Sequence, residues 1–289
     1  MHVALATCLQ KPQLTSGDAR LAAALEARGA SVGAHPWNGP FDPFAAADLV
    51  VVRSTWDYMR FAGAFAAWID RLEAQARRVA NAPALMRWNL SKTYLLDLAE
   101  NGAPLPPTVI AEPDVRALAD AVDRLGLDEA VVKPVIGGGA FGLSVVRRRD
   151  PASFVQAVGQ LAGPALVQPL LSQIRTTGET SLVFFAGDFS HAVEKRPKQG
   201  SILVQEEHGG STVPARVGGE AVEAARGILK LLPQAPLYAR VDLVLGDSAR
   251  LDGGLKLMEV EVIEPSLFLE HDEAAADRFA EALLHELKV

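Results

Sequence analysis

The sequence predicts a chain of two architectures, an α/β unit on a parallel sheet followed by an α+β region. Short apolar strands alternate with helices in the first part of the chain, which is typical of α/β units. Three prolines within residues 102–107 interrupt this alternation. Beyond them, longer strands succeed one another with fewer helices between them, and this order indicates an α+β region with antiparallel sheets.

In the first unit, we expect helices on both faces of a parallel sheet. One helix begins at Ser16, a good N-cap residue, and ends at Gly29, which suits a C-terminal turn. The strands are expected at residues 3–9, 31–37 and 49–52, and a second helix at 61–77. Ligands of parallel sheets bind beyond the carboxyl ends of the strands. The residues that follow the third strand are therefore candidates for a binding site.

In the second region, a helix is expected to open at residues 89–92. The later strands are expected at residues 108–110, 130–134, 143–147, 181–185, 190–195, 238–245 and 255–263, and the later helices at 114–125, 151–161, 219–232 and 273–287. Internal repeats and low-complexity tracts are absent from the sequence. We divide the chain into three units, which are residues 1–87, 88–168 and 169–289.

The composition narrows the classes of function. The formal net charge is −7, which argues against a general nucleic-acid surface. No stretch approaches the roughly 20 apolar residues that span a bilayer, and no targeting pattern is visible at the start of the sequence. The lone cysteine, Cys8, cannot form an intrachain disulfide, and this fits a reducing compartment. We expect a cytoplasmic protein that binds neither nucleic acid nor membranes.

Lys133 lies at the end of an apolar strand and is followed by the glycines Gly137, Gly138 and Gly139. Glycines let the backbone approach anionic oxygens and point N–H groups at them, so this segment suits phosphate binding. The order differs from the P-loop pattern, in which the lysine follows the glycines. The motif alone leaves two interpretations open, a phosphate site and a glycine-rich hairpin turn beside an extended lysine.

Three carboxylates form the strongest motif. Asp242 lies in an apolar strand, and Glu259 and Glu261 alternate in another. A period of two places Glu259 and Glu261 on the same face of their strand. Like charges side by side in apolar surroundings are costly unless a cation neutralises them, and carboxylates are ligands that magnesium prefers. Arg240 shares a face with Asp242 and could steady the same phosphates. A solvated face with salt-bridged acids is the alternative interpretation.

Two further segments are candidate substrate contacts. One follows the third strand and carries Arg53, Ser54, Thr55 and Asp57. The other is the loop of residues 205–211, in which His208, Gly209 and Gly210 could close over a site or form an exposed hairpin. On the strand expected at residues 190–195, His191 is a candidate substrate contact and Lys195 is a candidate phosphate cation.

The order of these motifs resembles that of the ATP-grasp superfamily, and within it the glutathione-synthetase-like branch. The resemblance covers roughly residues 88–270 with motifs, and the first unit by architecture only. It implies an ATP-grasp fold with a parallel-sheet pre-ATP-grasp domain at 1–87, a linker helix that carries Lys92 and a small central lid at 88–168, and an antiparallel-sheet subdomain with the metal site at 169–289.

The resemblance also implies ATP and Mg²⁺ as cofactors. Two magnesium ions would be bound by Asp242, Glu259 and Glu261. The transferring phosphoryl group would be stabilised by Lys133, Lys195 and Arg240. The adenine would lie against residues 168–171. The candidate nucleotide-binding residues are Lys92, Lys133, Gly137, Gly138, Gly139, Gln168, Pro169, Leu170, Leu171, Glu179 and Lys195.

Two positions depart from the usual pattern of the superfamily. The last metal ligand is commonly asparagine and is Glu261 here, and the adenine connector commonly carries an acidic residue near the position of Gln168. Both departures indicate a divergent branch. Together with residues 53–58 and 205–210, the motif of residues 259–265 resembles the branch that includes a cycloserine-forming ligase.

The resemblance implies a ligase that activates the carboxylate of an amino-acid-like small molecule as an acyl phosphate. An amine then attacks, either from a second molecule or from the same one, as in cycloserine formation. Positioning and charge neutralisation are the main needs of such chemistry. A small-molecule kinase and a non-catalytic nucleotide-binding protein stay as alternatives. The resemblance is also compatible with a homodimer.

Overall fold

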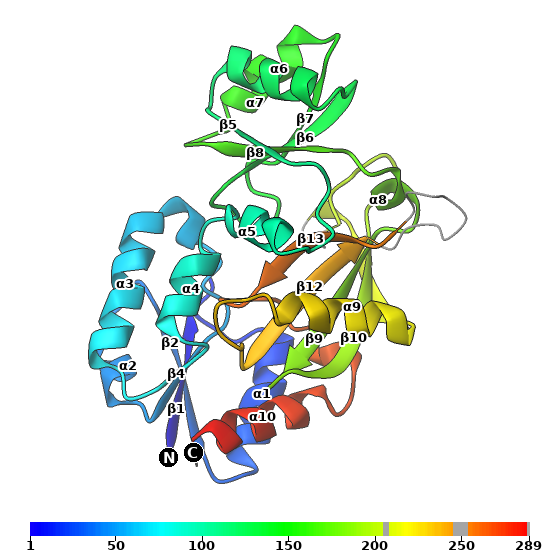
Figure 1. Cartoon of the computed structure of the whole chain (residues 1–289). Helices are drawn as coiled ribbons and strands as arrows, with labels where there is room; N and C mark the ends of the chain where they lie inside the picture. Colours follow the sequence, from blue (N-terminus) through cyan, green and yellow to red (C-terminus); the bar gives the residue numbers. More distant parts are fainter. Residues whose placement is uncertain (205–207, 245–253, 288–289) are drawn as a thin grey trace.

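The computed structural model describes residues 1–204, 208–244 and 254–287, and it contains three sheets with covering helices (Figure 1). Residues 205–207 of the predicted loop and Leu245 of a predicted strand lie outside the described residues. The N-terminal sheet is parallel, and the other two sheets are antiparallel. The predicted α/β unit followed by an α+β region is confirmed.

The N-terminal sheet has the strand order β2-β1-β3-β4. Its strands are β1 (His2–Thr7), β2 (Ser31–Pro36), β3 (Leu49–Val52) and β4 (Val79–Ala80), and its helices are α1 (Ser16–Glu26), α2 (Asp42–Ala46) and α3 (Ala62–Gln75). Side chains of β1 alternate between two apolar cores, one against α1 and one against α3. The sequence did not predict α2 or β4, which are too short to show a hydrophobic period.

Two short helices, α4 (Pro83–Asn89) and α5 (Tyr94–Glu100), lead out of this unit. The prediction that a helix opens at residues 89–92 and carries Lys92 is wrong, because Asn89 ends α4 and Lys92 lies in the turn before α5. Tertiary hydrogen bonds hold this turn. The amide of Asn89 donates to Val260 O at 2.9 Å and accepts from Val262 N at 3.2 Å, and Lys92 N donates to Val135 O at 2.6 Å.

The middle of the chain forms a small four-stranded sheet, seen at the top of Figure 1. Its strands, in the order β5-β8-β6-β7, are β5 (Val109–Ala111), β8 (Ala165–Pro169), β6 (Glu129–Pro134) and β7 (Ser144–Arg147). The helices α6 (Val115–Arg124) and α7 (Pro151–Val158) share an apolar core with it. The sequence predicted β5, β6, β7, α6 and α7 to within a few residues, and the structure pairs β6 with β7 antiparallel.

The C-terminal sheet has the order β11-β10-β9-β12-β13. Its strands are β9 (Glu179–Phe185), β10 (Asp188–Arg196), β11 (Ser211–Ala215), β12 (Tyr238–Val244) and β13 (Lys256–Glu261). The accompanying helices are α8 (Ser172–Thr176), α9 (Gly219–Leu229) and α10 (Ala275–Glu286). The short elements α8 and β11 were not predicted. All seven residues of β12, which lies between β9 and β13, are buried.

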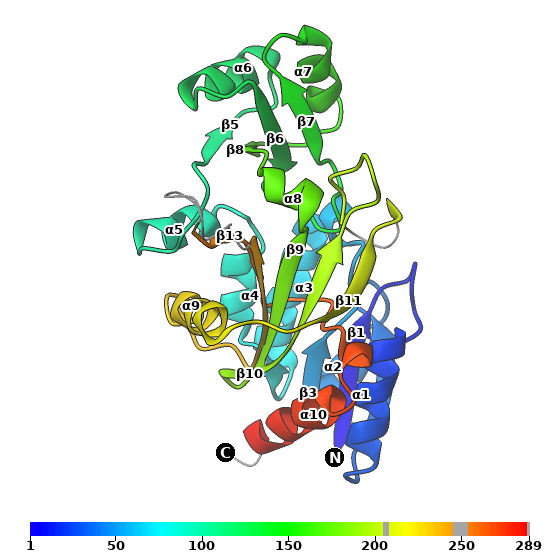
Figure 2. The same cartoon turned by 90° about the vertical axis from the view of Figure 1, so that its right-hand side faces the viewer.

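The last helix connects the C-terminal sheet with the N-terminal unit. Helix α10 packs against α1, as both views show (Figures 1 and 2). On its other side, Phe279 stacks on Phe185 of β9 with ring centroids 4.6 Å apart. One apolar core therefore contains residues from β1, α1, β9 and α10. Among the described residues, no helix has both the length and the apolar character that crossing a bilayer requires. The unit boundaries at 87/88 and 168/169 stay a prediction.

Candidate active site

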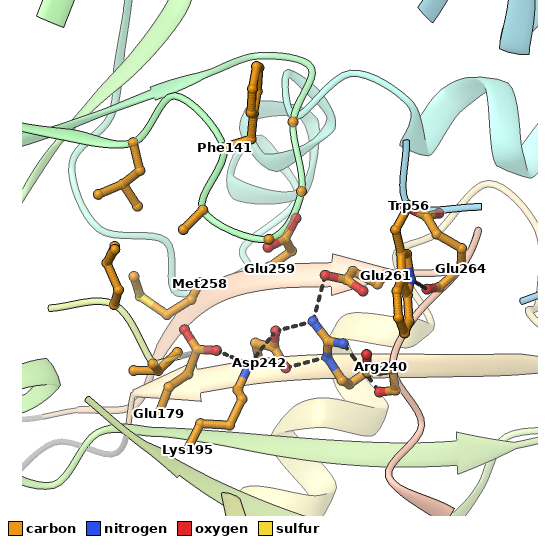
Figure 3. A pocket seen from close by; sticks show the side chains of 18 of the residues that line it. Trp56, Phe141, Glu179, Lys195, Arg240, Asp242, Met258, Glu259, Glu261 and Glu264 are labelled. Carbon is orange, nitrogen blue, oxygen red and sulfur yellow. Dashed lines mark hydrogen bonds and ion pairs between the residues drawn. The ribbon is translucent and has the colours of Figure 1, made fainter. Parts of the chain in front are cut away.

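A cavity of about 560 Å³ lies where the three sheets meet. Its walls come from the loops after β1 and β3, from β6 and its glycine loop, and from β9, β10, β12 and β13. The parallel sheet thus contributes the residues beyond the carboxyl ends of two of its strands, as expected. Figure 3 shows the charged groups at the cavity floor, most of which project from the antiparallel sheet.

The three predicted metal-ligating carboxylates come together in this cavity. Asp242 of β12 lies opposite Glu259 of β13 in the strand register, and Arg240 lies opposite Glu261. One oxygen from each of Asp242, Glu259 and Glu261 lies within 4.8 Å of the others. The predicted alternation therefore places both glutamates on the face that Asp242 occupies. Three carboxylates at this spacing could hold a hard divalent cation such as magnesium.

Basic side chains pair with each of these acids, and Figure 3 shows the partners of Asp242 and Glu261. Arg240 donates to both oxygens of Asp242 at 2.9 Å and to Glu261 Oε1 at 2.5 Å. Lys195 Nζ lies 3.2 Å from Asp242 Oδ2 and also contacts Glu179. Lys92 forms an ion pair with Glu259. The structure therefore brings the predicted catalytic cations and the predicted metal ligands into one network.

Burial raises the pKa values of the carboxylates in the cavity, whereas their ion pairs with basic side chains lower them. Burial opposes ionisation, but Arg240 and Lys195 hold the pKa of Asp242 well below its usual range. Burial raises the pKa of Glu261 to about 7, since Arg240 only partly offsets the loss of solvent. Burial, with Glu261 nearby, also raises the pKa of Glu264 to about 8. The carboxylates of one cavity thus differ widely in their affinity for a proton.

The predicted phosphate-binding segment lies on the lid side of the cavity. Lys133 Nζ is 3.5 Å from Met258 O, and burial lowers the pKa of Lys133 to about 8. Gly137, Gly138 and Gly139 line the cavity. The next loop residue with a large side chain, Phe141, lies with its ring 5.4 Å from the Arg60 guanidinium of the N-terminal unit.

The predicted adenine connector also lines the cavity. Its members are Gln168, Pro169, Leu170 and Leu171. Gln168 is buried, and its amide donates to Thr108 Oγ1 at 2.8 Å. This bond fixes the amide at the position where the superfamily commonly has an acid. An apolar group formed by Leu171, Ile174, Val204 and Met258 continues the wall, as a flat heterocycle requires.

The predicted substrate residues divide into two groups. Arg53 and Asp57 line the cavity, and Asp57 accepts hydrogen bonds from Trp37 at 2.7 Å and from Asn38 at 2.9 Å. The remaining members are not in the cavity wall. They are Ser54 and Thr55, which are buried, and His208, Gly209 and Gly210, of which His208 Nε2 lies 3.4 Å from Gly139 O.

A segment after β13, residues 262–267, runs along the cavity, and we call it the carbonyl segment. Each of its six carbonyl oxygens accepts a hydrogen bond from a side chain. Asn81 donates to Val262 O at 2.7 Å, Tyr238 to Ile263 O at 2.8 Å and Trp56 to Glu264 O at 3.0 Å. Arg53 donates to Pro265 O at 2.8 Å, Arg240 to Ser266 O at 3.2 Å and His191 to Leu267 O at 2.8 Å. The donors come from both the N-terminal unit and the C-terminal sheet, so the segment fixes one against the other.

Sequence reasoning missed several cavity residues. Asp18, Glu264 and Glu270 all line the cavity. Asp18 lies in the first turn of α1, where its backbone N–H donates to the N-cap Thr15. The signal that could have found it is an acid at the beginning of the first helix after the first strand, since that end of the sheet faces the ligand. His191 was considered as a substrate contact, and the structure places its ring on the carbonyl segment instead.

Comparison with known proteins decides the family. Residues 3–81 match the family model of the N-terminal domain of D-cycloserine synthetase DcsG. The cycloserine biosynthesis protein DcsG of Streptomyces lavendulae is 35% identical over 263 residues, which cover 83% of this chain and 84% of that protein. This chain belongs to the DcsG family.

Solved structures agree with this assignment. The crystal structure of D-cycloserine synthetase DcsG has a TM-score of 0.86 and 28% identity, covering 99% of this chain and 100% of that one. A D-alanine–D-alanine ligase from Bacillus anthracis has a TM-score of 0.72 at 16% identity, covering 100% and 97% of the two chains, and shows the shared fold. The predicted ATP-grasp fold is confirmed, and the DcsG family member described here is an ATP-dependent carboxylate–amine ligase.

Proposed function

We propose that this ligase phosphorylates the carboxylate of an α-amino acid and then closes a ring with a nitrogen of the same molecule. The proposal follows from the family, because the DcsG relatives are named for cycloserine. In a cycloserine ring, the former carboxyl carbon is bonded to a nitrogen that is attached to the side-chain oxygen. The substrate class is therefore an α-amino acid with a nitrogen on its side-chain oxygen.

The proposed reaction has two steps. A carboxylate oxygen attacks the γ-phosphorus of ATP, and the bond to the β-phosphate oxygen breaks, which releases ADP. The side-chain nitrogen then attacks the acyl carbon, the carbon–oxygen bond to the phosphate breaks, and the nitrogen loses a proton as phosphate leaves. Lys195 and Arg240 are held at the cavity floor by Asp242, so they could stabilise charge on the transferring phosphoryl group without rearranging.

Two magnesium ions fit the donor set. The three carboxylate oxygens within 4.8 Å of one another are hard ligands of the kind magnesium takes, and Asp242, Glu259 and Glu261 would hold the ions. When bound, magnesium neutralises phosphate charge. The acids of this network already have basic partners. Fully ionised ATP and two magnesium ions together carry no net charge. Binding them therefore leaves the net charge of the site unchanged.

The remaining nucleotide contacts are proposed from position. Lys92, Lys133 and the three glycines would bind phosphates, with Glu179 holding Lys195 in place. Residues 168–171 would bind the adenine. Arg53 and Asp57 would contact the substrate, and Ser54, Thr55 and residues 208–210 would support that contact from outside the cavity wall. The expected homodimer stays a prediction, which light scattering of the purified protein checks.

The observation that carries the metal and phosphoryl-transfer part of the proposal is the cluster of Asp242, Glu259 and Glu261 beside three basic side chains. Its test is phosphate release from Mg·ATP with O-amino-D-serine, combined with mass spectrometry of the product. Glu259→Gln should lower kcat/KM by at least about 100-fold. Glu194→Gln makes the same chemical change on the same sheet outside the cavity wall and should leave turnover unchanged. Undiminished turnover in Glu259→Gln would rule out the metal assignment, and a stable phosphorylated product without ring closure would indicate a kinase.

A further inference from the structure

Buried polar atoms without partners are concentrated at one place in the described part of the chain. They are Asp18 Oδ2, Arg53 Nη1, Ser54 Oγ and Thr55 Oγ1, and elsewhere only Trp68 Nε1 shares this state among the described residues. Most buried polar groups in folded proteins have a hydrogen-bond partner, so such a concentration needs an explanation. A bound ligand is one explanation, because it could satisfy these atoms.

Two of these residues, Asp18 and Arg53, belong to the cavity wall. Each is 2% exposed. Arg53 Nε donates to Asp18 Oδ1 at 2.7 Å, and Arg53 Nη2 donates to Pro265 O at 2.8 Å. Each residue therefore uses part of its hydrogen-bonding capacity inside the protein and keeps one atom unused. The unused atoms are a carboxylate oxygen and a guanidinium nitrogen.

The protein holds this pair in a fixed position. The Arg53 guanidinium lies 5.7 Å from the Tyr238 ring and 5.9 Å from the Phe279 ring. Asp18 lies in the first turn of α1, whose N-cap is Thr15. Neither side chain is free to turn toward a different partner, because the ion pair and the aromatic rings define the orientation of both. A ligand would meet a preorganised group, which lowers the cost of binding.

We propose that Asp18 binds the α-ammonium group of the substrate and that Arg53 positions Asp18 for this task. The inference rests on the proposed function. A carboxylate oxygen accepts hydrogen bonds, so its ligand must be a donor, and the α-ammonium is the cationic donor of an amino acid. The substrate carboxylate is the other charged group, but it is the group that reacts and must lie near the phosphates, at the Asp242 end of the cavity.

A neighbouring glycine leaves room for a second carboxylate, that of Glu270, beside the start of α1. Gly17 lines the cavity beside Asp18. A Cβ atom on Gly17 would lie 2.7 Å from a carboxylate oxygen of Glu270, closer than real Cβ contacts occur. The absence of a side chain thus lets Glu270 lie next to the helix start, and it adds a second carboxylate to the region that would receive a cation.

The assignment explains how one of two nitrogens is selected. In the proposed reaction, the side-chain nitrogen attacks the acyl phosphate and the α-amino group does not. An ammonium bound to Asp18 stays protonated and has no lone pair for attack, because the carboxylate favours the charged form. Asp18 is therefore a specificity residue of the ligase, and Arg53, the proposed substrate contact beside it, also positions Asp18.

The test compares two probes that differ only in the α-amino group, O-amino-D-serine and 3-(aminooxy)propanoate. Calorimetric titrations are run with the full chain, Mg²⁺ and a non-hydrolysable ATP analogue. The wild-type protein should bind the deamino probe at least about 100-fold more weakly, since a buried charged partner is left unpaired. In Asp18→Asn this ratio should fall below about threefold while the affinity for the ATP analogue is unchanged. Asp48→Asn, which alters an aspartate–arginine pair outside the cavity wall, should keep the wild-type ratio.

Loss of a buried charge beside Arg53 could prevent folding, so a third probe is titrated into the wild-type protein. This probe is O-amino-D-serine trimethylated on the α-nitrogen. Its α-nitrogen keeps the positive charge but has no N–H to donate, and the probe should bind as weakly as the deamino probe. The inference is overturned if the wild-type protein fails to discriminate, including the case in which no probe binds, or if Asp18→Asn keeps the ratio. Ring closure without discrimination would leave the proposed function standing and remove this inference. Discrimination between the probes without phosphate release would support the role of Asp18 and contradict the proposed function.

Discussion

Pro265 and Ser266 are neighbours in the chain, and their carbonyl oxygens bind two arginines that belong to different ends of the cavity. Arg53 donates to Pro265 O at 2.8 Å, and Arg240 donates to Ser266 O at 3.2 Å. Arg53 is paired with Asp18, and Arg240 with Asp242 and Glu261 of the carboxylate cluster. The two ends of the cavity are therefore joined through two consecutive peptide units, so a shift of the carbonyl segment would move both.

Tyr238 tests how much the carbonyl segment contributes to stability. Its hydroxyl lies 2.8 Å from Ile263 O and 3.0 Å from Val52 O in a fully buried position. Tyr238→Phe removes the donor and leaves both acceptors buried, so we expect a loss of about 1–3 kcal/mol in the free energy of unfolding. Urea denaturation measures this. Thr176→Val removes an exposed hydroxyl and should change stability by less than about 0.5 kcal/mol. An equal effect in the two variants would contradict the role of the segment.

His191 should make stability depend on pH. Burial lowers the pKa of His191, and its ring donates to Leu267 O at 2.8 Å from Nε2. The charged groups that face it act in opposite directions, because Asp272 favours the charged ring and Arg278 opposes it. Since the folded-state pKa lies below the unfolded value of 6.5, the stabilisation is fully present above pH 6.5. It is lost as the pH falls through the folded-state pKa, by at most about 1.4 kcal/mol per pH unit.

The measurement for His191 is the difference in unfolding free energy between pH 7.5 and pH 5.5. His191→Gln keeps an N–H donor but cannot be protonated, so the difference should shrink relative to the wild-type protein. His285→Gln replaces an exposed histidine and should leave the difference unchanged. Equal pH dependence in the wild-type protein and His191→Gln would show that other groups carry the effect.

The sequence predicted a cluster of carboxylates because its signal is local. Glu259 and Glu261 alternate within one strand, so the period of two placed them on one face. The register of β12 with β13 then brings Asp242 to the same face. Lys133 and the glycine loop were visible for the same reason. The fold class followed from the alternation of long elements, whereas α2 and α8, five residues each, carried no periodic signal.

Other parts of the site depend on tertiary contacts that the sequence does not show. Asp18 and Arg53 are 35 residues apart, and their pairing arises only because α1 begins where β3 ends. The carbonyl segment offers backbone acceptors, which are the same for every residue type and leave no pattern in side chains. Lys92 was wrongly placed on a helix because the turn that holds it is stabilised by Val135 and β13, far away in the chain.

The contact between Phe141 and Arg60 should help to close the lid over the nucleotide. The Arg60 guanidinium lies 5.4 Å from the Phe141 ring. Gly139 belongs to the same loop as Phe141, and its carbonyl oxygen lies 3.4 Å from His208 Nε2. Phe141→Ala should raise the KM for ATP about two- to fivefold, as expected for one partly exposed cation–π pair, with little change in kcat. Steady-state phosphate release measures both constants.

A double-mutant cycle separates this contact from a general effect on the lid. If the pair acts as a unit, Arg60→Ala should add little to the effect of Phe141→Ala. Val155→Ala removes another exposed apolar side chain of the same subdomain, far from the loop in sequence, and should leave the KM unchanged. Fully additive effects of Phe141→Ala and Arg60→Ala would show that the two side chains act independently.

Glu261 occupies a position where the superfamily commonly has asparagine, and its exchange tests what the extra charge contributes. Glu261 Oε1 accepts from Arg240 at 2.5 Å and lies within 4.8 Å of the oxygens of Asp242 and Glu259. Glu261→Asn keeps an oxygen ligand but removes a negative charge, so the Mg²⁺ concentration for half-maximal activity should rise about tenfold. At saturating Mg²⁺, kcat should recover.

Glu261→Leu offers no oxygen, and its kcat should stay at least about 100-fold lower at any Mg²⁺ concentration. Phosphate release measured across a MgCl₂ series distinguishes these outcomes, and an unchanged Mg²⁺ dependence in both variants would show that Glu261 serves Arg240 rather than the metal.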